Sequence, residues 1–403
     1  MSRPRCVVVG TGRMAGGFVA PVLADAGWDT VLVGREPEVI ESIAAQGEVR
    51  VRFGGQGARE RRVGGVSAMH HDDPRLREAI LGADLLATAV GPGALGPVGR
   101  ALAQPLRERL EAGRPINLIT FENHRRASAL IATGLLDAEP SLAGEVGRRL
   151  GIGGAAVWRA IASRSVGPDG VRYEADPVDE CHVDGLALLD GHPPRDGSVP
   201  GLRLTDAFDD RMVEKLWVFN AGHAAAAFAG WLAGAGTVAD ALARDDIRDH
   251  VARVVDEAGF AFAARQRGRG ADRLAPRNAA DILARYADAA LADPVTRVAR
   301  EPRRKLAADD RLIGPAYACL AAGREPMALA ATAAAGLAYA EASDPQARDL
   351  QAEVAYFGPE ETLTTVAGLH PGEELSRLVC EAFRHDSTPT RRSLAERVEA
   401  SGA

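Results

Sequence analysis

The chain has 403 residues, of which 46% are hydrophobic and 26% are charged, and both fractions are typical of a globular protein. This composition excludes disorder, collagen and coiled coil, and the length predicts two domains. The net charge of −7 does not favour nucleic acid or an anionic membrane as a partner, so we expect a small-molecule ligand. No apolar run approaches the roughly 18 residues of a membrane span, and we expect a cytoplasmic protein.

The predicted elements alternate between strand and helix over the first half of the chain. A β-branched run at 6–9 precedes a glycine turn, a helical pattern at 18–27 and a second strand at 29–34. Further strands are predicted at 83–90 and 114–123. This order predicts an α/β fold, a Rossmann-type doubly wound parallel sheet over residues 1–200.

The second half of the chain has a different composition. The segment from Gly185 to Asp206 is rich in Gly, Pro and Asp, and we expect it to connect two domains. Long Ala, Leu and Arg stretches follow, which predict a mostly α-helical domain over residues 201–403. The four cysteines are widely spaced without a CxxC pattern, so neither a disulfide framework nor a metal site is predicted.

The glycine turn has the pattern G-x-G-x-x-A, with Gly10, Gly12 and Ala15 directly after a strand and at the start of a helix. In such a turn the first Gly permits the tight bend, the second allows backbone to approach a pyrophosphate, and the helix N-terminus faces the phosphates. The sequence therefore predicts a nicotinamide dinucleotide. The candidate cofactor-binding residues are Gly10, Thr11, Gly12, Arg13, Met14, Arg35, Val90 and Gly91.

The end of the second strand bears on the choice of dinucleotide. An NAD enzyme usually places an acid there on the ribose 2′-hydroxyl, whereas this chain has Gly34, Arg35 and Glu36. Because Arg35 suits a 2′-phosphate, NADP is favoured over NAD. Glu36 could still serve a ribose, so NAD stays the alternative.

A polar trio opens the helical half. Only two of the 48 basic residues are lysines, and one of them, Lys215, shares the segment EKLWVFNAGH with Asn220 and His223. At 100° per residue His223 lies about 80° and Asn220 about 140° around a helix from Lys215, so the three can share a face. A lysine in a partly apolar site can have its pKa lowered toward neutrality, which suits a general acid/base.

The spacing K-x4-N-x2-H and its continuation NAGHAAAAFAGWLAGAGTVADAL resemble the polyol-specific long-chain dehydrogenases, in particular the mannitol-1-phosphate 5-dehydrogenase branch. The same resemblance is carried by GTGRMAGGF, TAVGPGAL, TFENHRRAS and TRVAREPRRKLAADDRLIGPA, so it covers nearly the whole chain in order. It implies a zinc-independent enzyme, with no metal, that is a monomer or a homodimer. By position, the resemblance implies that Lys215 is the acid/base, that Asn220 and Asn123 form an oxyanion site, and that His223 orients substrate or lysine.

The chain departs from the family pattern at several places. Ala15 replaces a third glycine, Gly34 replaces an acid, and Trp158 stands in the Asp position of VDRIVP. Tyr286 and its neighbours lack a family asparagine-proline pair. These changes concern the cofactor and the substrate cleft more than the reaction.

A basic segment supplies candidate substrate residues. Arg304, Lys305 and Arg311 suit a phosphate, although a solvated charge run is the equally weighted alternative. We therefore predict an oxidoreductase for a polyol phosphate and a ketose phosphate, of the mannitol 1-phosphate and fructose 6-phosphate type. The alternatives are a reductase of a cyclitol or other sugar-derived ketone, a ketopantoate-reductase-like enzyme, and a non-catalytic dinucleotide sensor.

Overall fold

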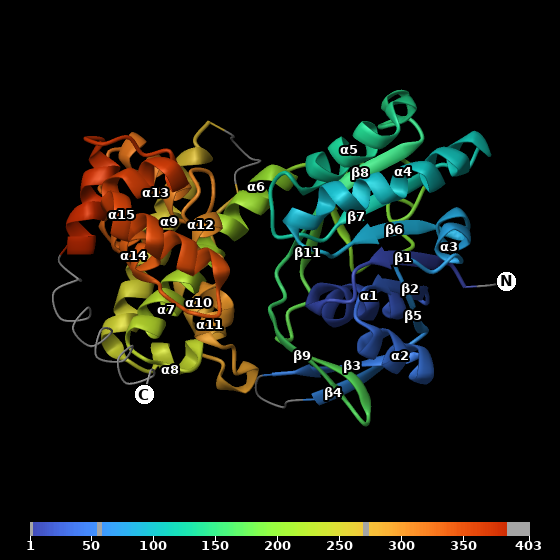
Figure 1. Ribbon diagram of the computed structural model, residues 1–403, viewed down its shortest axis with the longest axis horizontal. Coiled ribbons are helices and arrows are strands. Elements are labelled where there is room, and N and C mark those ends of the chain that lie inside the picture. The colour runs from blue at the N-terminus through green and yellow to red at the C-terminus, as the bar shows by residue number, and fades with distance from the viewer. Residues whose placement is uncertain (1–2, 55–58, 269–273, 385–403) are drawn as a thin grey trace. The chain divides into compact units, whose positions relative to one another are not determined.

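The computed structural model describes residues 3–54, 59–268 and 274–384. The chain divides into two compact units, Met1–Met212 (unit 1) and Val213–Ala403 (unit 2) (Figure 1). Within the described ranges no helix is both long and apolar enough to cross a membrane.

Among the described residues of unit 1, eight strands form a sheet in the order β12-β11-β8-β7-β6-β1-β2-β5. Six neighbouring strands of this sheet run parallel to one another: β8, β7, β6, β1, β2 and β5. Strand β11 is antiparallel to β8. The order reverses between β1 and β6, which makes their carboxyl ends the switch point where ligands bind in doubly wound sheets. The bounds are β1 Arg5–Val9, β2 Asp29–Gly34, β5 Val66–His70, β6 Leu85–Thr88, β7 Ile116–Thr120, β8 Leu150–Val157, β11 Cys181–Asp184 and β12 Arg203–Thr205.

Alternate residues of the buried strands serve two separate cores. In β1, Val7 packs with helices α3, α4 and α5, whereas Cys6 and Val8 pack with the turn η1 and helices α1 and α2 on the other face. This period of two is what a sheet covered on both faces requires. The helical elements are η1 Ala15–Val19, α1 Ala20–Asp25, α2 Pro37–Gln46, α3 Leu76–Gly82, η2 Pro92–Ala94, α4 Leu95–Glu111, α5 Ala127–Ala138 and η3 Pro140–Gly144.

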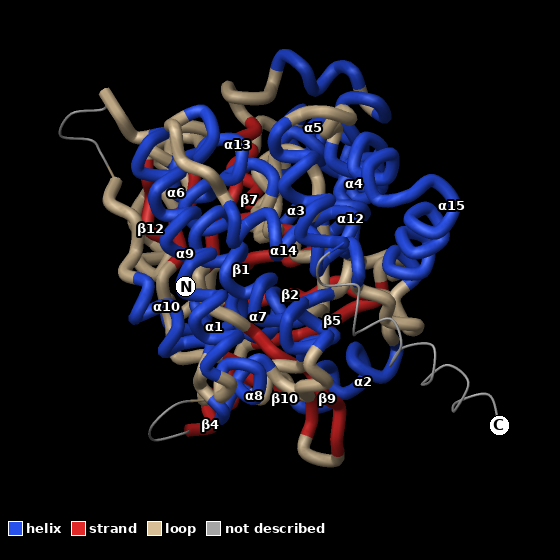
Figure 2. The backbone as a smooth tube through the Cα atoms, turned by 90° about the vertical axis from the view of Figure 1, so that its left-hand side faces the viewer, coloured by secondary structure: helices blue, strands red, loops and turns tan. Residues whose placement is uncertain are grey.

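A second sheet lies beside α2 and η1, with strand order β4-β3-β10-β9. Its strands are β3 Glu48–Phe53, β4 Arg59–Gly64, β9 Ile161–Gly167 and β10 Gly170–Ala175. The sequence analysis did not predict this sheet. In Figures 1 and 2 the turn between β9 and β10 projects at the bottom of this sheet.

The segment expected to connect two domains is folded against unit 1. Asn117 of β7 donates from Nδ2 to the Pro193 carbonyl at 2.9 Å, and Trp28 donates from Nε1 to the Ser198 carbonyl. The same segment ends in β12, which extends the main sheet. Its Gly and Pro residues therefore shape a packed loop of the Rossmann-type unit.

Unit 2 is helical, as the alanine-rich stretches predict. Small residues let α7 approach its neighbours closely: a Cβ at Gly222 would lie 2.6 Å from Val255, and one at Gly230 would lie 2.7 Å from Ala241. The alanines are thus part of close helix packing. The elements are α6 Phe208–Glu214, which spans the division, η4 Lys215–Phe219, α7 Asn220–Leu232, α8 Val238–Leu242, α9 Asp245–Arg265, α10 Ala279–Tyr286, η6 Ala289–Leu291, α11 Val295–Ala299, α12 Pro302–Lys305, α13 Ile313–Ala321, α14 Met327–Ala338 and α15 Pro345–Ala367.

Candidate active site

The glycine turn after β1 has the shape that a dinucleotide needs. Gly10 has a φ of +134°, and a Cβ there would lie 2.5 Å from the Ala89 carbonyl oxygen, so only glycine fits. A Cβ at Gly12 would meet its nearest atom at 3.9 Å, which leaves the backbone open on that side. With Thr11 in the loop and Arg13 and Met14 opening the helix, the turn fits a pyrophosphate at a helix N-terminus.

The second sheet supports this turn. Within its first turns the helix after the loop contains a π turn, η1, in which Ala20 donates its backbone N–H to the Ala15 carbonyl. Gly16 lies under the Tyr173 ring, since a Cβ there would be 2.1 Å from the ring. The Tyr173 hydroxyl donates to the Thr11 carbonyl at 3.1 Å. Packing from β10 therefore fixes the loop backbone.

A buried carboxyl group holds the loop after β6. Glu122, two residues after β7, accepts hydrogen bonds from Thr88 Oγ1 and from the Val90 backbone N–H, both at 3.0 Å. Burial raises the pKa of Glu122 to about 7, although these donors oppose the shift. The loop contains the predicted cofactor residues Val90 and Gly91, and Asn123 directly follows Glu122. Sequence reasoning missed Glu122, for which its place in TFENHRRAS was the only signal.

In unit 2, a π turn joins the predicted lysine and amide. Lys215 opens η4, and the backbone N–H of Asn220 donates to the Lys215 carbonyl five residues earlier. A π turn therefore replaces the regular helix assumed in the sequence analysis. Single π turns are frequent at functional sites. Lys215 and Asn220 are both 7% exposed, and Leu216 to Phe219 between them are buried.

His223 follows on the next turn, in α7, and its ring is held from two sides. Its Nε2 lies 3.2 Å from Asp293 Oδ2, and its ring stacks on Tyr286 at 4.9 Å between centroids and an angle of 7°. The Tyr286 hydroxyl donates to the Phe219 carbonyl, which ties the stack to the π turn. Sequence reasoning missed Asp293, which lies far along the chain.

The charges around His223 define its state. Burial lowers the pKa of His223 below its ordinary value, although the hydrogen bond with Asp293 and the charge of that carboxylate oppose the shift; the charges of Arg297 and Arg311 act with burial. Although burial opposes ionisation, the hydrogen bond with His223 and the charge of Arg297 hold the pKa of Asp293 below its usual range. We therefore assign a neutral imidazole that donates Nε2–H to Asp293 and keeps Nδ1 as an acceptor.

The three predicted substrate residues have different surroundings. Arg304 Nε lies 2.8 Å from Glu301 Oε2, and its side chain is partly exposed. Lys305 is 2% exposed and donates from Nζ to the Arg300 carbonyl. Burial, together with the charges of Arg311 and Arg304, lowers the pKa of Lys305 well below its ordinary value. Lys305 is therefore held inside the fold.

Arg311 keeps a buried donor that meets no acceptor among the described residues. Its Nε lies 2.6 Å from Asp310 Oδ1, and the side chain is buried. Nη2 of Arg311 is also buried and meets no hydrogen-bond acceptor in the part of the chain that the structure describes. A buried guanidinium N–H without an acceptor costs free energy, so it is a good position for a polar ligand group.

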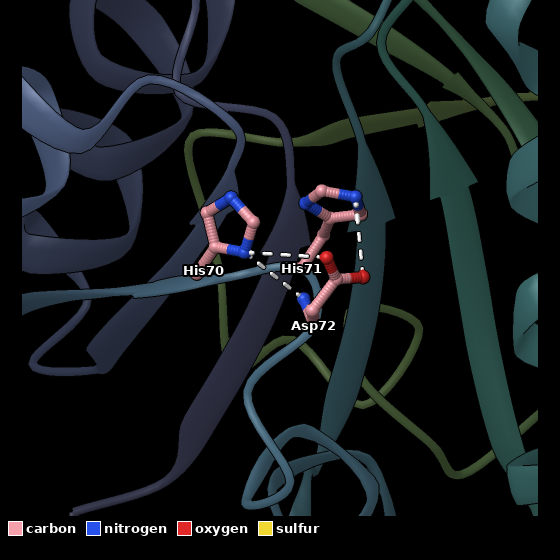
Figure 3. Close-up of side chains that lie close together, drawn as sticks. All are labelled: His70, His71 and Asp72. Atoms are coloured by element: carbon pink, nitrogen blue, oxygen red, sulfur yellow. Dashed lines mark hydrogen bonds and ion pairs between the residues drawn. The ribbon is translucent and has the colours of Figure 1, made fainter.

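One group of side chains in the described residues has ligand atoms close enough for a metal: His70, His71 and Asp72 (Figure 3). The group lies at the end of β5, where the His71 N–H donates to the Gly34 carbonyl. His70 Nδ1 already accepts the Asp72 backbone N–H at 3.3 Å, and Asp72 is exposed. The sequence analysis predicted no metal, and the family resemblance implies none.

These features define the class of the protein. A Rossmann-type unit with a glycine turn shaped for a dinucleotide, joined to a helical unit with a buried lysine, amide and oriented histidine, is typical of a nicotinamide-dinucleotide-dependent dehydrogenase. Residues 4–162 match the family model of the mannitol dehydrogenase Rossmann domain, and residues 208–365 match that of the mannitol dehydrogenase C-terminal domain. The chain belongs to the mannitol dehydrogenase family, and it is an oxidoreductase acting on CH–OH groups. The predicted family, fold class and enzyme class are confirmed.

Solved structures share this fold at low sequence identity. Mannitol 2-dehydrogenase of Pseudomonas fluorescens, in a ternary complex with NAD and D-mannitol, is 15% identical with a TM-score of 0.79, over 99% of this chain and 95% of its own. A D-sorbitol dehydrogenase in substrate-free form is 15% identical with a TM-score of 0.72, over 95% and 93%. A 2-dehydropantoate 2-reductase of Geobacter metallireducens GS-15 is 18% identical with a TM-score of 0.52, over 82% and 98%.

Proposed function

We propose that this enzyme interconverts a polyol phosphate and the matching ketose phosphate, of the mannitol 1-phosphate and fructose 6-phosphate type, with NADP(H) favoured over NAD(H). The observation that carries the proposal is the π turn from Lys215 to Asn220, continued by the oriented His223. It gathers a proton donor, an amide and an imidazole on consecutive turns of buried helix.

When bound, the nicotinamide would supply or accept the hydride. In the direction of ketone reduction, the carbonyl oxygen gains negative charge, and Lys215 delivers the proton that turns it into a hydroxyl. The Asn220 amide donates to the developing oxyanion, a role that the family resemblance also gives to Asn123. His223 accepts from a substrate hydroxyl at Nδ1, because its other nitrogen is committed to Asp293.

The preference for NADP(H) is supported at the end of β2. A Cβ at Gly34 would lie 2.4 Å from Thr11 Cγ2 and 2.6 Å from Thr11 Oγ1. The acid that most NAD enzymes carry here therefore does not fit unless Thr11 moves. Arg35, exposed at the next position, is suited to a 2′-phosphate. The Pseudomonas fluorescens structure contains NAD, so dinucleotide choice differs from that neighbour under this proposal.

For the substrate phosphate, the contacts favour Arg311. Its buried Nη2 can donate to an anionic group. Because the charge of Arg311 lowers the pKa of His223, this donor lies near that imidazole, which supports an anion-binding site there. Arg304 adds a partly exposed guanidinium. The Lys305 amine donates to the Arg300 backbone carbonyl, so in this proposal Lys305 stabilises the fold and does not contact the phosphate.

The internal position of Lys305 also favours a second candidate. If Arg311 is the main residue that contacts the anion, a phosphate is weakly bound, and the same catalytic groups would suit an unphosphorylated cyclitol or other sugar-derived ketone. The neighbours named for mannitol and sorbitol support unphosphorylated polyols as well. Fructose 6-phosphate and fructose as paired substrates separate the two candidates.

The acid/base role is tested by replacing Lys215 with Ala and, separately, with Arg. Arginine keeps the positive charge but cannot deprotonate near neutral pH, so both variants should lose turnover by about 10²- to 10⁴-fold. NADPH binding, followed by its fluorescence, should be retained in both. Turnover of K215A within tenfold of the wild type would contradict the assignment.

A further inference from the structure

Arg164 of β9 holds two groups of unit 1 that belong to the proposed cofactor site. Its Nη1 donates to the Thr11 carbonyl at 3.2 Å, in the glycine turn. The same guanidinium forms a two-pronged contact with Glu36, at 3.1 Å from Nη1 to Oε1 and 2.5 Å from Nη2 to Oε2. Arg164 lies across from Tyr173 in the register of β9 and β10, and the Tyr173 hydroxyl donates to the same Thr11 carbonyl.

The partner of this guanidinium is placed to be exchanged. Glu36 follows Arg35 directly at the N-terminus of α2, and its side chain is 57% exposed while that of Arg164 is 20% exposed. An arginine fork that accepts a carboxylate in two-pronged geometry accepts a phosphate in the same way. The more exposed Glu36 can turn to water at little cost, whereas Arg164 is fixed by the Thr11 carbonyl.

We propose that Arg164 is, with Arg35, the second cation that recognises the 2′-phosphate of NADP(H), and that the Glu36 carboxylate occupies its fork until the phosphate replaces it. This inference rests on the proposed NADP preference. A phosphomonoester carries more negative charge than a carboxylate, so the 2′-phosphate displaces the Glu36 carboxylate from the Arg164 guanidinium. NAD(H) has no such group, and with it the Arg164–Glu36 pair stays intact.

The test uses the full chain and isothermal titration with NADP⁺ and NAD⁺, which differ only in the 2′-phosphate. Arg164→Gln should weaken NADP⁺ binding by about 10- to 100-fold, the effect of losing a charge-assisted pair, and leave NAD⁺ within about threefold. Glu36→Gln should strengthen NADP⁺ binding because it removes the competing anion. Tyr173→Phe is the matched control: it removes the other hydrogen bond to the Thr11 carbonyl and should change both dinucleotides equally.

The outcomes are separable. Tighter NAD⁺ than NADP⁺ binding by the wild type would overturn both the cofactor proposal and this inference. A wild type that prefers NADP⁺, with an Arg164→Gln variant that loses both dinucleotides to the same extent, would overturn this inference alone and assign Arg164 to loop support. Weaker NADP⁺ binding by Glu36→Gln would contradict the exchange. Circular dichroism of each variant establishes that the chain remains folded.

Discussion

Glu122 gives a pH dependence of stability that the structure allows us to work out. Its pKa of about 7 in the folded chain compares with an ordinary value of 4.5, so the folded chain binds more protons than the unfolded chain between these values. The free energy of unfolding therefore contains a contribution that is fully present below pH 4.5 and is lost as the pH rises through 7. At about 1.36 kcal/mol per pKa unit, this contribution is roughly 2–3 kcal/mol between pH 5 and pH 8.

Glu122→Gln removes this titration and keeps the shape. The amide oxygen can accept from the Val90 N–H, and the amide nitrogen can donate to Thr88 Oγ1, since a hydroxyl serves as donor or acceptor. The difference in stability between variant and wild type should shift by roughly 2–3 kcal/mol in favour of the variant from pH 5 to pH 8.

The assay is urea unfolding of both full chains in matched buffers at pH 5, 6, 7 and 8, followed by circular dichroism. Glu41→Gln, at an exposed position of α2, is the control and should follow the wild type at every pH. A constant difference between the free energies of unfolding of Glu122→Gln and the wild type from pH 5 to pH 8 would refute the argument. Glu122 would then keep one protonation state throughout.

Two further substitutions test the packing and the site. Asp293→Asn removes the carboxylate that accepts Nε2–H of His223, and kcat should fall by about 10- to 100-fold with NADPH binding unchanged; an unaltered kcat would contradict the orienting role. Gly16→Ala places a Cβ 2.1 Å from the Tyr173 ring and should lower stability by about 1–3 kcal/mol in thermal unfolding. Gly144→Ala, where a Cβ would meet nothing within 4 Å, should be near neutral, and equal effects of the two would count against the packing argument.

The parts of the fold that local patterns encode were predictable. The β-α-β unit at the N-terminus follows from a strand, a glycine turn and helical periodicity within residues 5–34. The second sheet was missed because β3 pairs with β10 more than a hundred residues later, as in the register of Arg50 with Arg172. The alternation in Glu48–Phe53 is visible in the sequence, but its partner is not.

The candidate site shows the same division. The grouping of Lys215, Asn220 and His223 was visible as a spacing, whereas the π turn that joins the first two was not, and its residues pack against α9. Asp293 reaches His223 through the tertiary fold. Lys305 is one of the two lysines of the chain, and the structure gives a physical reason for a lysine at this position: its buried amine donates to the Arg300 carbonyl, where the larger guanidinium would need more acceptors.

The central claim is tested most directly by the absorbance at 340 nm of the purified enzyme with NADPH or NADH, against fructose 6-phosphate and fructose in parallel. The account predicts oxidation of NADPH with fructose 6-phosphate at a much higher kcat/KM than with NADH or with fructose. Equal or faster turnover with NADH and fructose would contradict both the cofactor and the phosphate assignments. Silence with both sugars, while NADPH binding is retained, would move the substrate to another sugar-derived ketone.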